Sequence, residues 1–132
     1  MQALTNFVNG THAASTGPQS DLIDPSTGAV FGHAPVSTAD DVDAACRAAQ
    51  QAFEEWRDAT PSERSLALFR IADAVEARAE ELIRVESQNT GKPLGLTATE
   101  EIPPTVDQIR FFATAARNPE RRSPGQPMRG RT

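Results

Sequence analysis

Hydrophobic positions along the chain follow two different periods, and the change between them falls near residue 36. Over residues 5–36, short apolar pairs alternate with turn-forming sequences such as Asn9-Gly10 and the stretch from Asp24 to Gly28. Asn-Gly supplies the positive φ angles that a tight hairpin turn needs, and Asp-Pro-Ser-Thr-Gly has the composition of a turn. The pattern therefore predicts a small antiparallel β meander in residues 1–36.

From residue 38 onward, apolar side chains recur every three or four residues, which predicts helices. Thr38 is placed to cap the first helix, and Asp40 and Asp41 favour its positive end. The apolar stripe of this helix consists of Val42, Cys46, Ala49, Phe53 and Trp56. A cysteine in such a stripe is expected to be a small buried hydrophobe.

A second helix is predicted to begin at Thr60 and Glu63, which have capping-box spacing, and to run to Asn89 before Gly91 and Pro93. About 30 helical residues give a single rod about 45 Å long. Because this rod is longer than any hydrophobic core that a chain of this size can build, part of its apolar stripe is expected to lack a packing partner within the chain. The two prolines break the preceding helix, and a last helix is predicted from Pro103 to about Arg117, with 118–132 as a linker.

The net charge of −5 is unevenly distributed. Residues 117–132 contain five Arg and one Glu, a balance of +4, which leaves −9 for residues 1–116. A basic tail binds RNA in some proteins, with strong salt dependence, but here it lacks interleaved aromatic residues. A solvated tail and no nucleic-acid partner are therefore expected.

The single cysteine excludes an internal disulfide and suits a reducing compartment. No apolar run approaches the roughly 18–20 residues that span a bilayer, and the N-terminus lacks the features of a signal peptide. The expectation is a cytoplasmic protein without a membrane partner.

Candidate chemistry is sparse, since no nucleophile constellation, P-loop or dinucleotide fingerprint is present. Glu100 and Glu101 precede two prolines, where they are either charges at a helix end or carboxylates that recognise a cationic substrate group. Phe111 and Phe112 either line an apolar tunnel or, at helical spacing, place one ring in the core.

The order of several short phrases resembles the opening of the aldehyde dehydrogenase superfamily. These phrases are residues 7–10 (FVNG), 23–28 (IDPSTG), 41–45 (DVDAA), 48–49 (AA), 53–56 (FEEW), 61–64 (PSER) and 86–93 (ESQNTGKP). Residues 101–107 (EIPPTVD), 110–113 (RFFA) and 115–118 (AARN) are similar to the bacterial γ-aminobutyraldehyde dehydrogenases of the aminoaldehyde and betaine aldehyde branch.

The resemblance implies an α/β fold with a Rossmann-type NAD domain, a catalytic domain and an oligomerisation sheet. Of this fold, the present chain supplies a mostly α piece with a small N-terminal antiparallel β meander, and residues 37–117 flank the NAD domain. The family enzyme is a homo-oligomer that uses NAD to oxidise an aldehyde substrate, here an aminoaldehyde such as 4-aminobutanal, to the acid. None of the family's catalytic residues is present, so this N-terminal part alone is expected to be inactive.

Three binding roles follow from the resemblance. The carbonyl of Ile23 and the side chain of Asn89 match positions that hold a structural Na⁺ or K⁺. Glu101 lies near the position where aminoaldehyde-specific relatives place a carboxylate that meets the substrate amine. Phe111 and Phe112 lie on the helix that borders the substrate tunnel. The alternative to an N-terminal part of a dehydrogenase is a stand-alone, non-catalytic helical module. Such a module would dock on a full-length dehydrogenase or on a second copy of itself.

Overall fold

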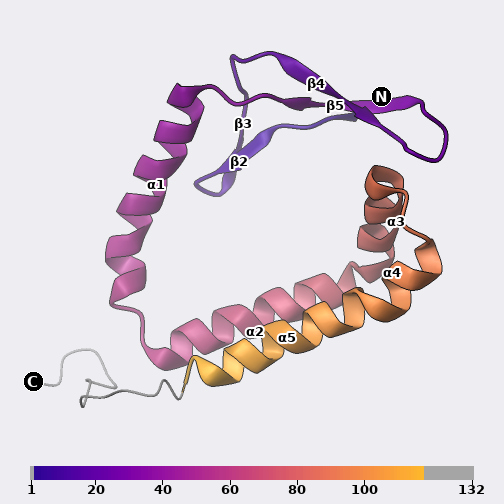
Figure 1. Ribbon diagram of the computed structural model, residues 1–132. Helices are drawn as coiled ribbons and strands as arrows, with labels where there is room; N and C mark the ends of the chain where they lie inside the picture. The colour runs from indigo at the N-terminus through magenta and orange to yellow at the C-terminus, as the bar shows by residue number, and fades with distance from the viewer. Residues whose placement is uncertain (1, 118–132) are drawn as a thin grey trace, which may run out of the picture. The chain divides into compact units, whose positions relative to one another are not determined.

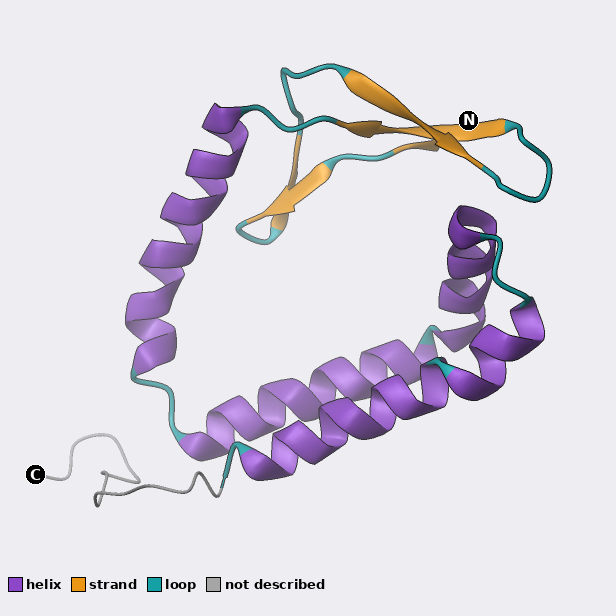
Figure 2. Ribbon diagram, viewed as in Figure 1, coloured by secondary structure: helices purple, strands orange, loops and turns teal. Residues whose placement is uncertain are grey.

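The computed structural model describes residues 2–117, and the predicted linker and basic tail at 118–132 lie outside this range. The described residues divide into two compact units, one of residues 2–57 with 88–91 and one of residues 58–87 with 92–117. The elements are β1 (Gln2–Ala3), β2 (Asn6–Val8), β3 (Thr11–Ala13), β4 (Gln19–Ile23), β5 (Val30–Pro35), α1 (Ala39–Arg57), α2 (Pro61–Ala77), α3 (Ala79–Thr90), α4 (Leu94–Glu100) and α5 (Ile102–Ala115) (Figures 1 and 2). The expected mostly helical chain with N-terminal antiparallel strands is confirmed.

The strands form two separate sheets rather than one continuous meander. β2 and β3 pair antiparallel through a turn at Asn9 and Gly10, both of which have positive φ as predicted. β4 pairs antiparallel with β5, and β1 joins the other edge of β5 in parallel. The sequence did not predict β1, because a two-residue strand is too short to show a period.

Helix α1 begins as predicted, since the Asp41 N–H donates to Thr38 Oγ1 at 3.2 Å. Asp41 Oδ2 in turn accepts the Thr38 N–H at 2.8 Å and the Ser15 hydroxyl at 2.6 Å. The helix has no buried residue, and Phe53 and Trp56 are about half exposed. The prediction that Cys46 is buried is wrong: the thiol is exposed, because an open groove separates this face of the helix from the residues around β2.

The hydrogen bonds at the start of α1 predict a pH-dependent contribution to stability. They lower the pKa of Asp41 below its ordinary value of 3.8, the Ser15 hydroxyl being the largest cause and the Thr38 N–H the next. A carboxyl whose pKa is lower when folded stabilises the protein above the unfolded pKa and loses this effect as the pH falls. Asp41→Asn should therefore destabilise the chain more at pH 6 than at pH 3 in urea unfolding.

Asp40→Asn is the matched control, because Asp40 is an exposed carboxylate in the same first turn, and no hydrogen bond to its side chain is observed from any residue of the range 2–117. It should change stability little at either pH. An equal loss for Asp41→Asn at both pH values would contradict the assignment of the stabilising charge to Asp41.

Helix α2 begins with the predicted capping box, in which Thr60 and Glu63 bond each other's backbone N–H. The single rod predicted through Asn89 is wrong, because α2 ends at Ala77 with Arg78 as its C-cap, and α3 starts at Ala79. The Arg78 N–H donates to the carbonyls of Val75 and Glu76, which breaks the regular helical hydrogen bonding. No Pro or Gly marks this break, and the bend lets α2 and α3 line one groove with the α4–α5 corner.

Helix α5 lies antiparallel beside α2, and the pair forms the core of the second unit (Figure 1). The buried residues of the two helices are small or medium in size: Ser65, Ala72, Val106 and Ala113. Arg110 crosses the interface and donates to Asp73 at 3.0 Å and Glu76 at 2.7 Å. The predicted helix break is confirmed, with both prolines in the first turn of α5. Within residues 2–117, no helix is both long and apolar enough to cross a membrane.

Candidate functional site

A groove of about 630 Å³ in the second unit is lined by both glutamates of the predicted acidic pair, Glu100 and Glu101. Three carboxylates face it, those of Glu86, Glu100 and Glu101. The remaining lining residues are apolar or neutral: Val75, Leu82, Val85, Thr97, Ile102, Pro104, Thr105 and Gln108. The arrangement suits a small molecule with an apolar body and a positive end, because both parts would find complementary surface.

Glu101 lines this groove at the corner between α4 and α5, while its role as the carboxylate that meets a substrate amine stays a prediction. Its Oε1 lies 2.5 Å from the Nζ of Lys92, which also lies 3.2 Å from Glu86 Oε1. The three side chains are each between 32% and 39% exposed. The pKa of Lys92 is raised above its ordinary 10.5, mainly by the hydrogen bond to Glu101 and next by the one to Glu86. The ammonium therefore stays charged at neutral pH.

Lys92 is not predicted as a site residue by the sequence, although it belongs to the phrase ESQNTGKP at residues 86–93. Lys92 follows the turn that ends α3, six residues after Glu86 and nine before Glu101. Those separations exceed the i to i+4 range in which side-chain pairs are recognisable on one helix. Only the fold therefore reveals that Glu101 already has a cationic partner.

Phe111 and Phe112 lie on α5 and are 65% and 61% exposed. Their rings contact each other edge to face, with centroids 5.4 Å apart. The expectation that one of them is core is wrong, because Val106 and Ala113 supply the buried face of α5. Neither ring lines the acidic groove, so a role at a tunnel stays a prediction.

Ile23 and Asn89 both belong to the first unit. Ile23 ends β4, and the next residue, Asp24, bonds the N–H and the hydroxyl of Ser26, which lower the pKa of Asp24. The segment that carries Asn89 approaches this turn, since a Cβ added at Gly91 would lie 2.8 Å from Cγ of Pro25. The fold thus brings the two segments together, while the cation site itself stays a prediction.

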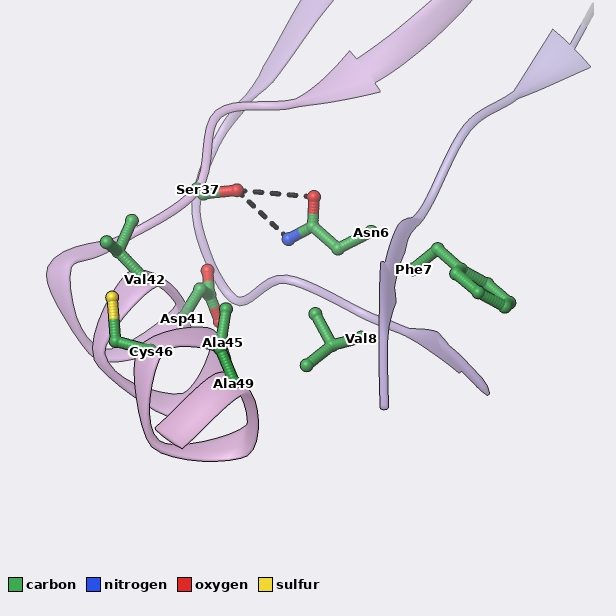
Figure 3. A pocket seen from close by; sticks show the side chains of 9 residues that line it. All are labelled: Asn6, Phe7, Val8, Ser37, Asp41, Val42, Ala45, Cys46 and Ala49. Carbon is green, nitrogen blue, oxygen red and sulfur yellow. Dashed lines mark hydrogen bonds between the residues drawn. The ribbon is translucent and has the colours of Figure 1, made fainter. Parts of the chain in front are cut away.

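A second groove, of about 400 Å³, lies in the first unit between α1 and the residues around β2 (Figure 3). Its lining consists of Asn6, Phe7, Val8, Ser37, Asp41, Val42, Ala45, Cys46 and Ala49. Its polar side chains already have hydrogen-bond partners. Asn6 Nδ2 donates to Ser37 Oγ at 2.9 Å, and Asp41 Oδ2 accepts hydrogen bonds from Ser15 and Thr38 outside the groove. Among residues 2–117, no group of three or more His, Cys, Asp or Glu side chains is placed to hold a metal ion.

Comparison with known proteins agrees with this fold. Residues 12–131 match the model of the aldehyde dehydrogenase family. Human 2-aminomuconic semialdehyde dehydrogenase is 40% identical over 113 residues, which are 86% of this chain and 23% of that enzyme. An aldehyde dehydrogenase of Rhodospirillum rubrum is 40% identical over 116 residues, 87% of this chain and 23% of the relative.

Solved structures give the same result. A putative aldehyde dehydrogenase of Burkholderia cenocepacia superposes with a TM-score of 0.83 at 33% identity, over 86% of this chain and 24% of that one. The NAD⁺ complex of a Bacillus cereus aldehyde dehydrogenase superposes with a TM-score of 0.81 at 30% identity, with the same coverage. The chain thus spans about a quarter of the length of these relatives. With a family match over most of its residues, the chain belongs to the aldehyde dehydrogenase family.

Proposed function

We propose that this chain forms the N-terminal part of an NAD-dependent aldehyde dehydrogenase that oxidises an aldehyde to its carboxylic acid. The observation that carries the proposal is the family match over residues 12–131. The superposition on an NAD⁺ complex supports NAD as the cofactor. In this proposal the residues that attack the aldehyde and bind NAD lie outside the chain, which supplies flanking helices and the acidic groove.

The proposed substrate class is an aminoaldehyde, such as 4-aminobutanal. The groove supports it through three carboxylates beside apolar walls. A primary ammonium would form charge-assisted hydrogen bonds to a carboxylate there. An alkyl chain of three or four carbons would lie against the apolar side chains, including Val85 and Pro104.

Further properties of the whole protein are proposed from the family resemblance. These are a cytoplasmic location, a homo-oligomer, no nucleic-acid partner, and a structural Na⁺ or K⁺ held by the carbonyl of Ile23 and the side chain of Asn89. The close approach of Gly91 to Pro25 supports the cation site, because it brings the two liganding segments together. Asn89 offers an oxygen without charge, so the affinity would be modest.

A graft tests the function. This chain would replace the corresponding N-terminal quarter of the Rhodospirillum rubrum aldehyde dehydrogenase, and NADH formation would be followed with butanal and 4-aminobutanal. We expect NAD-dependent turnover from the graft within about tenfold of the intact relative, since the helices support the catalytic domain without touching the reacting atoms. The relative without its N-terminal quarter and the 132-residue chain alone are the controls, and both should be inactive.

A soluble graft with the oligomeric state of the intact relative but no turnover would contradict the proposal. The exposed stripe of α1 favours a second function, that of a non-catalytic module that docks on a dehydrogenase or on itself. Sedimentation of the chain alone separates the two, because a module that associates with itself forms a defined oligomer whose dissociation follows protein concentration.

A further inference from the structure

The two neighbouring carboxylates at the α4–α5 corner differ in how their charge is compensated. Glu101 contacts the protonated ammonium of Lys92 at 2.5 Å, and Lys92 is itself outside the set of residues that line the groove. Glu101 is both the C-cap of α4 and the N-cap of α5, so the two helix dipoles act on its charge with opposite signs, and the contact with Lys92 supplies the compensation. The charge of Glu101 is therefore largely balanced from within the protein.

Among the described residues, Glu100 has no such cationic partner. It is the last residue of α4, where the carbonyl end of the helix dipole disfavours a carboxylate. It is exposed and lines the groove, and within residues 2–117 no hydrogen bond or ion pair to its side chain is observed. A cation that enters the groove therefore gains more from Glu100 than from Glu101.

We propose that Glu100, rather than Glu101, is the groove carboxylate that binds the ammonium group of the aldehyde substrate. The inference rests on the proposed aldehyde dehydrogenase function and names the residue that sets the preference for a cationic substrate. Lys92 acts indirectly, because its ammonium occupies Glu101 and repels a second positive charge placed beside it. The sequence, in which the two glutamates are adjacent, does not distinguish them.

Binding to the 132-residue chain tests the proposal without any catalysis. Propylammonium would be titrated into the protein while the side-chain carboxyl carbons of glutamate are followed by NMR, with Glu100→Gln and Glu101→Gln to assign the signals. The Glu100 signal should move to saturation, and the Glu101 signal should not. Propanol, the neutral analogue, should move neither. Movement of the Glu101 signal instead, or of no glutamate signal, would overturn the proposal.

Kinetics of the grafted enzyme give a second readout, the ratio of kcat/KM for 4-aminobutanal to that for butanal. Glu100→Gln should lower this ratio about tenfold, and Glu101→Gln should lower it less than about twofold, as expected for one lost charge-assisted hydrogen bond. In a Lys92→Met background Glu101 loses its ion pair with Lys92 and becomes available to the substrate ammonium. Glu101→Gln should then lower the ratio several-fold. An effect of Glu101→Gln that equals that of Glu100→Gln in the otherwise unchanged graft would overturn the assignment.

The two readouts separate this inference from the function on which it rests. A graft that oxidises neither aldehyde contradicts the proposed function, and the propylammonium titration then still decides between the two glutamates. A graft that oxidises butanal and prefers 4-aminobutanal, but keeps this preference in Glu100→Gln, upholds the function and overturns the role of Glu100.

Discussion

Val106→Asp should destabilise the chain by about 3 kcal/mol or more, because it places an unpaired charge in the interface between α2 and α5. Val106 is only 4% exposed, and the neighbouring helix α2 buries Ser65 and Ala72. Such small side chains bring two helices close together, which leaves little room for a carboxylate and its water. The loss would be measured as the free energy of unfolding in urea, followed by circular dichroism.

Thr105→Asp is the matched control, since Thr105 is exposed on the same helix one residue earlier. It should change the free energy of unfolding by less than about 0.5 kcal/mol. If Val106→Asp does not fold, Val106→Ala provides a milder test, with an expected loss of about 1–2 kcal/mol. A loss below about 1 kcal/mol for Val106→Asp would show that α5 is not packed on α2 in solution.

Gly17→Ala should destabilise the first unit by about 2–3 kcal/mol, the upper part of the range of about 1–3 kcal/mol that is typical when atoms are forced into a filled space. A Cβ at residue 17 would lie 2.0 Å from the carbonyl oxygen of Val36. Backbone cannot move aside as a flexible side chain can, because the Val36 N–H is hydrogen-bonded to the Pro18 carbonyl at 2.8 Å. The substitution should therefore open the start of the β4–β5 ladder, seen as faster amide exchange in both strands.

Gly28→Ala is the control for this substitution, because it lies in the turn between the same two strands. A Cβ at residue 28 would meet no atom within 4 Å, but the φ angle of +71° is one that alanine adopts only with strain. The expected loss is about 1 kcal/mol, from strain alone. Equal losses at Gly17 and Gly28 would contradict a steric origin for the effect at Gly17.

The local signals in the sequence predicted helix starts and tight turns correctly. Thr60 and Glu63 form the capping box that their spacing indicated, and Asn9-Gly10 adopts the expected positive φ angles. Helix caps and hairpin turns involve groups within about four residues of each other, so a single sequence contains all of the information. The family resemblance is of the same kind, since it depends on the order of short phrases.

The candidate site was predicted only in part. The sequence indicated Glu101 as a carboxylate for a substrate amine, but its bond to Lys92 joins two residues that are separated by the whole of α4. The difference between Glu100 and Glu101 follows from that bond, so the sequence could not show which of them is available to a cation. The same holds for Phe112, whose helical spacing suited a core position that Val106 and Ala113 fill instead.

Sequence patterns alone thus established the helical class, the caps, the antiparallel turns and the family of this chain. The tertiary structure was needed for the end of α2 at Ala77, the separation of the strands into two sheets, the exposure of Cys46 and the ion pair of Glu101 with Lys92. The physical reason is the range of the interactions. Capping and turn geometry act between near neighbours, whereas burial and ion pairing depend on which distant segments the packing brings together.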